Sequence, residues 1–130
     1  MIRKIDTKRE SSRFVIHQGL AVFTGHISPF ADDLRGQSED ILYRYEELMS
    51  KFNLKKENII YYTAYLKDIS KADEFNDVWN TWVIRHHEPA GIIVQAVPNQ
   101  SLPYGDNVQL ELSLIVAMEE NDVENWQNWQ

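Results

Sequence analysis

The sequence of 130 residues contains no cysteine. This absence excludes disulfide bonds, thiolate metal sites and thiol nucleophiles, and it suits a reducing compartment, so we expect a cytoplasmic protein. Long apolar runs are missing as well. No stretch approaches the ~20 residues of a membrane-spanning helix, and the charged opening MIRKIDTKRE is followed by no apolar signal core. We therefore expect a soluble protein that is neither exported nor inserted into a membrane.

Positive charge is scarce. The chain has 13 lysines and arginines against 20 aspartates and glutamates, which gives a net charge of -7 at pH 7. Part of the excess acid lies in the C-terminal MEENDVENWQNWQ. Such a chain repels nucleic acid and anionic membranes on average, and the sequence shows no basic patch that would support a ribonuclease activity. We therefore expect neither a nucleic acid nor a membrane as a partner.

Spaced metal ligands are missing too. His86 and His87 are adjacent, and the side chains of adjacent residues point in different directions on a helix or a strand. No second cluster supplies further ligands at a suitable spacing. We expect neither a metal site nor a bound cofactor.

The residues that are present describe one globular domain. The apolar share of 43% is sufficient for a single core, and no internal linker, repeat or low-complexity block interrupts the chain. RFVIH and GLAVF have the composition of strands, IRKID precedes them, and Gln18 and Gly19 form a turn-like pair between them. We predict two or three N-terminal strands with a hairpin turn at Gln18 and Gly19.

Two later segments have helical periodicity. HISPFADDLRG has the composition of a loop that ends in a helix cap. The apolar stripe of the helix that follows consists of Ile41, Tyr45, Leu48 and Phe52, with Leu42 and Met49 beside it. A second helix is predicted to begin with a capping box formed by Ser70 and Asp73. Its apolar stripe consists of Phe75, Val78, Trp79, Trp82 and Val83.

Three further segments are predicted strands: NIIYYTAYLKD, GIIVQAV and NVQLELSLIVA. The last two are separated by PNQSLPYGD, which predicts a long turn. The resulting order is β-β-β-α-β-α-β-β, and it favours an α+β structure in which two helices cover one face of a mixed sheet. NIIYYTAYL and the closing strands are apolar on both faces, so the second face needs a cover from another chain.

The last strand alternates cleanly between apolar and polar residues. Leu110, Leu112 and Leu114 share one face, and Glu111 and Ser113 share the other. Two interpretations of Glu111 remain open at this point. It is a surface carboxylate on a half-solvated strand, or it is a functional group whose pKa is raised by desolvation in a partly dry cleft.

The ordered set of segments resembles the Rid (reactive intermediate deaminase) family, also called the YjgF or endoribonuclease L-PSP family. VIHQGLAVFTGHIS resembles the family's strand pair, which ends in a Thr-Gly or Ser-Gly step. EPAGIIVQAVP and VQLELSLIVA resemble its two closing strands, and IRKID, VIH and VWNTWV look closest to the YoaB-like branch. The resemblance implies one Rid-like domain over residues 1–118, followed by an acidic tail at 119–130 that contains Trp126 and Trp129.

The resemblance also implies a chorismate-mutase-like fold, a homotrimer whose sheets line a central barrel, and ligand clefts between subunits. In active members an arginine after Pro-Ala grips the carboxylate of a 2-imino or enamino acid, and a glutamate on the last strand positions water. Glu111 matches that glutamate, and Asn76 matches an asparagine near the cleft. Gly91 stands where the arginine is expected, and KRESSRF stands where active members carry a Gly-Pro-Tyr tyrosine.

Two functions follow from the resemblance. The favoured one is a ligand-binding or divergent trimer with little imine or enamine deaminase activity, whose cleft holds Glu111 without a balancing guanidinium and so prefers neutral or cationic ligands. The alternative is an active deaminase in which Glu111 positions water and another cation holds the substrate. The candidate cations are Arg13, Arg35 and Arg85.

Overall fold

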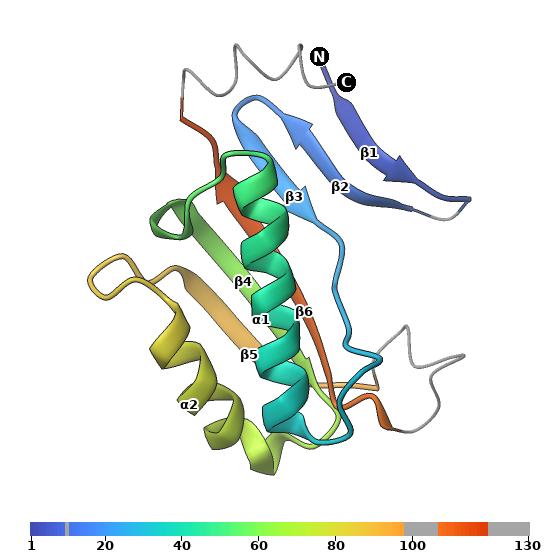
Figure 1. Cartoon of the computed structure of the whole chain (residues 1–130), viewed down its shortest axis with the longest axis vertical. Helices are drawn as coiled ribbons and strands as arrows, with labels where there is room; N and C mark the ends of the chain where they lie inside the picture. Colours follow the sequence, from blue (N-terminus) through green and yellow to red (C-terminus); the bar gives the residue numbers. More distant parts are fainter. Residues whose placement is uncertain (10, 98–106, 120–130) are drawn as a thin grey trace.

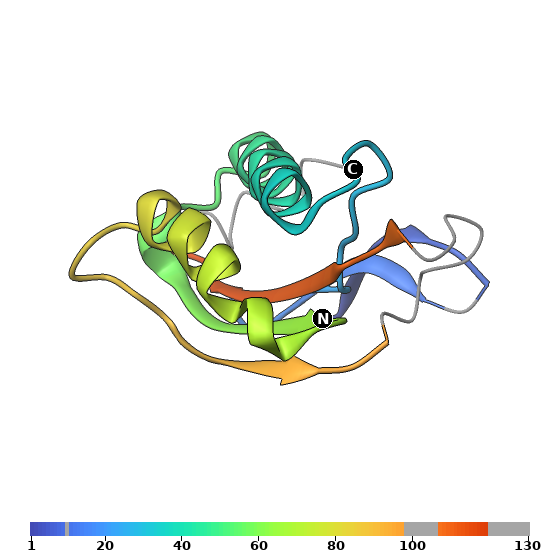
Figure 2. The ribbon, with the colours of Figure 1, turned by 90° about the horizontal axis from the view of Figure 1, so that it is seen from below.

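The computed structural model describes residues 1–9, 11–97 and 107–119. Six strands form one mixed sheet, and two helices lie together on one face of it (Figures 1 and 2). The elements are β1 (Arg3–Thr7), β2 (Ser12–His17), β3 (Leu20–Phe23), α1 (Leu34–Lys51), β4 (Ile59–Leu66), α2 (Ala72–Trp82), β5 (Ala90–Gln95) and β6 (Leu110–Ala117). The predicted α+β class and element order are confirmed.

The sheet has the strand order β1-β2-β3-β6-β4-β5. All neighbouring strands are antiparallel except β4 and β5, which are parallel because α2 carries the chain back between them. The last strand therefore lies in the interior of the sheet, between the N-terminal strands and the β4–β5 pair (Figure 1).

The turn between β2 and β3 is formed as predicted. Gln18 and Gly19 have φ angles of 51° and 79°, and the left-handed backbone of both central residues matches a hairpin turn of the primed type.

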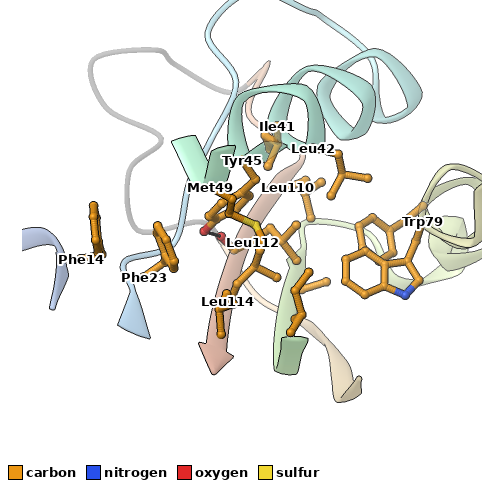
Figure 3. Close-up of a cluster of buried hydrophobic side chains, with 14 of the residues drawn as sticks. Phe14, Phe23, Ile41, Leu42, Tyr45, Met49, Trp79, Leu110, Leu112 and Leu114 are labelled. Carbon is orange, nitrogen blue, oxygen red and sulfur yellow. Dashed lines mark hydrogen bonds between the residues drawn. The ribbon is translucent and has the colours of Figure 1, made fainter. Parts of the chain in front are cut away.

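The core lies between the sheet and α1. Ile41, Leu42, Tyr45 and Met49 are buried against Leu110, Leu112 and Leu114 of β6 (Figure 3). The two periodicities read from the sequence, about 3.6 for the helix and two for the strand, thus meet in one cluster.

The N-terminus of α1 is capped as expected, whereas the predicted cap of α2 is wrong. Asp33 accepts a hydrogen bond from the Gly36 N–H at 2.8 Å. Ser70, however, lies inside a short 3-10 turn, Ile69–Lys71, and Asp68 accepts hydrogen bonds from its N–H and its hydroxyl at 3.0 and 2.7 Å. An aspartate two residues before a serine closes this tighter turn, so α2 begins after it without a side-chain cap.

The face of the sheet opposite the helices is only partly covered. Val22 of β3 and Ile92 of β5 are 44% and 48% exposed. No helix within the described residues is long and apolar enough to cross a membrane. The predicted turn at 98–106, together with Trp126 and Trp129 of the tail, lies outside the described residues.

Candidate functional site

A β-bulge interrupts the pairing of β3 with β6. Val22 pairs with Ile115, and the next bridge joins His26 to Leu112, through N–H to carbonyl bonds of 2.8 and 2.9 Å. Three residues on the first strand, 23 to 25, therefore oppose two on β6, 113 and 114. The extra residue bends the strand and changes the direction of the side chains beside it. The Thr24–Gly25 step thus forms the centre of the candidate site.

Glu111 lies against this bulge and is buried, with 6% of its surface exposed. A Cβ atom on residue 25 would lie 2.4 Å from Oε2 of Glu111 and 2.6 Å from its Cγ. Only glycine leaves room for the carboxylate there. Of the two interpretations of Glu111, the surface carboxylate is therefore wrong, and the structure places the residue in a buried setting.

Tyr45 of α1 reaches the same bulge from the core. Its hydroxyl donates a hydrogen bond to the carbonyl oxygen of Leu112 at 2.7 Å (Figure 3). The carbonyl oxygen of Thr24 is a second, longer acceptor at 3.2 Å. Burial, with a contribution from the charge of Glu111, raises the pKa of Tyr45 well above its ordinary value. The phenol is therefore neutral at physiological pH and acts as a hydrogen-bond donor.

His26 completes the group around the bulge. Its ring stacks on Tyr45 with a centroid distance of 4.4 Å and meets Phe23 edge-on at 6.4 Å. Burial, followed by the positive charges of Arg13 and Arg44, lowers the pKa of His26 to about 4. The imidazole is therefore uncharged at pH 7, and it has both a donor and an acceptor nitrogen.

Gly91 lies in a different setting, on the parallel pair β4–β5. It pairs with Tyr62, and a Cβ atom on residue 91 would lie 2.1 Å from Cδ1 of that ring. The ring of Tyr62 in turn packs on Trp79 of α2 with a centroid distance of 4.3 Å. The missing side chain at position 91 therefore leaves no empty space, because an aromatic ring fills it.

The three site residues expected from the resemblance do not meet within one chain. Gly91 pairs with Tyr62, whereas Glu111 pairs with Tyr65, three positions further along β4. Because side chains alternate between the faces of a strand, Gly91 and Glu111 point to opposite faces of the sheet. Asn76 lies on α2 and is partly buried on the helix-covered side. Within one chain, these three residues therefore do not form a single site.

A cavity of about 590 Å³ opens between the tip of the β1–β2 hairpin, the bulge and the last two turns of α1. Its lining includes four cations and one carboxylate: Lys8, Arg13, Arg44, Lys51 and Glu47. Sequence reasoning missed this cluster. The only local signal was the spacing of seven between Arg44 and Lys51, two turns of one helix face, because nothing in the sequence places the hairpin beside α1.

The cations proposed as substitutes for the arginine have separate locations. Arg13 lines the cavity, Arg35 forms an exposed ion pair with Asp77 at 3.3 Å, and Arg85 is exposed. Within the described ranges, no three His, Asp or Glu side chains gather in a way that would hold a metal ion.

A family model described as "Endoribonuclease L-PSP" matches residues 1–118. Since this match spans most of the chain, the protein belongs to the endoribonuclease L-PSP family, which is also known as the Rid or YjgF family. The family membership that the sequence resemblance suggested is therefore confirmed.

Individual relatives agree with this assignment. A "RutC family protein" of Haemophilus ducreyi is 28% identical over 97 residues, which cover 74% of this chain and 83% of the relative. A YjgF-family structure from Neisseria meningitidis has a TM-score of 0.83 at 22% identity and covers 92% of this chain and 97% of its own. A Rid-family structure from Yersinia pestis has a TM-score of 0.75 at 16% identity, with coverages of 91% and 100%. The two structures show that the fold is YjgF-like.

Proposed function

We propose that this protein is a YoaB-like member of the Rid family that forms a homotrimer through its 1–118 domain. In this proposal it binds a small molecule in the cleft between subunits and has little deaminase activity toward 2-imino and enamino acids. The observation that carries the proposal is the chemistry at position 91. A glycine stands where the resemblance places the substrate-gripping arginine, and Tyr62 covers it.

The open face of the sheet supports the trimer. Val22 and Ile92 are exposed on strands at opposite sides of β6, and a second copy that covers this face buries them. Assembly also resolves the separation of Glu111 from Gly91, because the exposed face of one chain then meets the sheet edge of the next. Sedimentation of the full chain at micromolar concentration is expected to give three copies. A monomer would contradict this architecture without bearing on the activity.

Weak deamination follows from the loss of the guanidinium. An arginine binds a carboxylate through two parallel charge-assisted hydrogen bonds, whereas glycine offers only its backbone. Losing one partner of such a pair in a closed cleft costs about 2–5 kcal/mol, and the lost orientation slows the reaction further. Glu111 is then left without the group that would hold an imine carbon in front of its water.

The alternative function, an active deaminase, is favoured by one observation. Arg13 and Gly25 both line the cavity beside the bulge. The Glu111 carboxylate packs against Gly25, in the space where a Cβ atom would otherwise lie. In this alternative Arg13 holds the substrate carboxylate. Arg13→Gln would then abolish imine hydrolysis, whereas the favoured function predicts no activity to abolish.

The test is an assay of imine hydrolysis to the keto acid and ammonia. The natural protein is expected to leave the rate close to that in buffer. A turnover comparable to that of an arginine-bearing family member would contradict the proposal. Gly91→Arg alone is a poor rescue variant because its Cβ atom collides with Tyr62. The informative variant combines Gly91→Arg with Tyr62→Ala, and Tyr62→Ala alone is the matched control.

A ribonuclease activity has no support in the charge distribution of this chain. The net charge is -7, and the basic side chains that the structure gathers surround one cavity instead of forming a track along the surface. Binding a polynucleotide requires a series of phosphate contacts along the surface, which a single local cluster does not offer.

A further inference from the structure

The cavity beside the bulge has a charge opposite to that of the whole molecule. Lys8, Arg13, Arg44 and Lys51 contribute four positive charges to its lining, and Glu47 contributes one negative charge. Asp6 and Asp40 pair with the two arginines, so the whole group has an excess of one positive charge (4 - 3 = 1). The chain as a whole carries a net charge of -7. These cations come from three separate segments, the β1–β2 hairpin, β2 and α1, so the fold concentrates them at one place.

Arg13 and Arg44 are each held in position by an ion pair through Nε, which leaves their terminal Nη groups as hydrogen-bond donors for a ligand. Nε of Arg13 lies 3.0 Å from the Asp6 carboxylate, and Nε of Arg44 lies 3.3 Å from that of Asp40. The Arg44 guanidinium also rests on the ring of Phe30, 4.4 Å from its centroid. Within the described residues, the terminal Nη atoms of these two arginines make no hydrogen bond, so the forked donors that bind oxyanions remain available.

The two lysines are less compensated still. In the part of the chain that the structure describes, no carboxylate lies within ion-pair distance of Lys8 or Lys51, and Lys51 has only a long contact with the Phe52 ring, at 5.8 Å. A lysine is a mobile point charge on a flexible stem, and it follows an anion of variable shape. The cavity thus combines two fixed forks with two adjustable charges.

The positive potential also acts on the His26 side chain. His26 is faced by Arg13 from β2 and by Arg44 and Tyr45 from α1, and Glu111 of β6 acts on Tyr45. Burial is the main cause that lowers the His26 pKa, and the charges of Arg13 and Arg44 lower it further. An anion in the cavity would offset these charges directly.

From this geometry we infer that the cavity between the β1–β2 hairpin, the bulge and α1 is a binding site for a small organic dianion. The volume of about 590 Å³ suits a metabolite-sized ligand. Apolar side chains of Ile27 and Leu48 line it together with the Ser11 side chain, so an organic body is accommodated beside the charged groups. Phosphate monoesters and dicarboxylates share the required charge. The cavity is lined by residues of one chain, so ligand binding there does not depend on the proposed inter-subunit cleft.

Isothermal titration at low salt tests this inference with four probes: glycerol 3-phosphate, succinate, acetate and ethanolamine. The two dianions are expected to bind at least about tenfold more tightly than acetate, and the cation is expected not to bind, because the excess of positive charge rewards each additional negative charge. Raising the salt concentration should weaken binding. The better of the two dianions identifies the phosphate or the dicarboxylate class. Failure of both dianions to bind at millimolar concentration would overturn the site.

Variants in which one charged side chain is replaced by neutral glutamine test whether the anion binds in this cavity. Lys51→Gln is expected to weaken the better dianion about fivefold to tenfold, and Glu47→Gln to strengthen it by a similar factor, since the two changes alter the local charge in opposite directions. Lys71→Gln, an exposed lysine on the far 3-10 turn, is the matched control for a change in net charge. Thermal unfolding verifies that each variant is folded. Equal effects of Lys51→Gln and Lys71→Gln would show that the anion binds elsewhere.

Discussion

Gly25 and Gly91 are both glycines because a neighbouring side chain lies across the backbone, but the two neighbours are chemically opposite. Across Gly25 lies the carboxylate of Glu111, and across Gly91 lies the aromatic ring of Tyr62. The region around Gly25 gathers a buried acid, a neutral histidine and a cationic cavity. The region around Gly91 is an aromatic stack that joins β4 to α2.

The missing Cβ atom therefore has a different physical meaning at each of the two glycines. At Gly25 the missing Cβ atom preserves polar chemistry, because it lets a charged group lie beside the chain. At Gly91 the missing Cβ atom allows the backbone to pack tightly against the aromatic ring of Tyr62. Three predictions test whether the region around Gly25 keeps neutral and charged polar groups buried, and whether the region around Gly91 mainly stabilises the fold.

The largest effect is expected in the aromatic region. Trp79 is buried and packs on both Tyr62 and Phe75, with centroid distances of 4.3 and 5.8 Å. Trp79→Ala should lower the free energy of unfolding by about 3–5 kcal/mol in urea denaturation, because it leaves a cavity in the stack. Tyr43→Ala, on the exposed side of α1, is the control and should change it by less than about 0.5 kcal/mol. If both variants lowered the free energy of unfolding by a similarly small amount, the aromatic region would not have the stabilising role assigned to it.

The second prediction concerns pH and the polar region. The pKa of His26 is about 4 in the folded protein and 6.5 ordinarily, so the unfolded chain binds this proton more tightly. The free energy of unfolding should therefore fall as the pH decreases from about 6.5 to about 4, with a contribution from His26 that reaches about 3 kcal/mol.

Urea denaturation of the natural protein and His26→Gln at pH 7 and at pH 4.5 isolates this contribution. Carboxylates also titrate in this interval, but they do so in both proteins, so the difference between the two pH profiles belongs to His26. The variant should have the flatter profile. Parallel profiles would mean that His26 is not held neutral beside the cationic cavity.

The third and smallest effect compares the glycines directly. Gly91→Ala and Gly25→Ala should each cost about 1–3 kcal/mol, because the added Cβ atom overpacks an occupied space. Tyr62→Ala should relieve only the cost at position 91, and Glu111→Ala only the cost at position 25, so double-mutant cycles should show coupling within each pair. Coupling across the pairs, between Gly25 and Tyr62, would contradict the separation of the two regions.

Much of the fold was predictable from local patterns. The alternation of Leu110, Leu112 and Leu114 identified the core face of β6, and the pair Gln18 and Gly19 identified the hairpin turn. Such features depend on neighbours in the sequence, which the pattern displays. The predicted cap of α2 was wrong because Ser70 donates its N–H and its hydroxyl to Asp68 in the preceding 3-10 turn, and the spacing of Ser70 and Asp73 alone does not show this.

The candidate site was less predictable because it depends on contacts across the fold. The alternation placed Glu111 on the polar face, but its burial follows from a bulge created where His26 bridges Leu112. The cationic cavity joins Lys8 to Lys51, and no sequence pattern links the hairpin to that end of α1. The expectation of a site that prefers neutral or cationic ligands rested on Glu111 alone and did not include these cations.

The position of β6 in the sheet has a consequence for how the molecule folds. Leu20 of β3 pairs with Ala117, and Ile59 of β4 pairs with Val116, so one late strand joins the N-terminal meander to the β4–α2–β5 unit. Until that strand docks, the two described parts of the sheet have no shared hydrogen-bonded edge, and the core residues of α1 lack Leu110, Leu112 and Leu114 as partners. Such long-range pairing slows folding because the loop entropy is lost before the contacts form. We expect β6 docking to be the rate-limiting event, in which the core and the bulge at Gly25 form together.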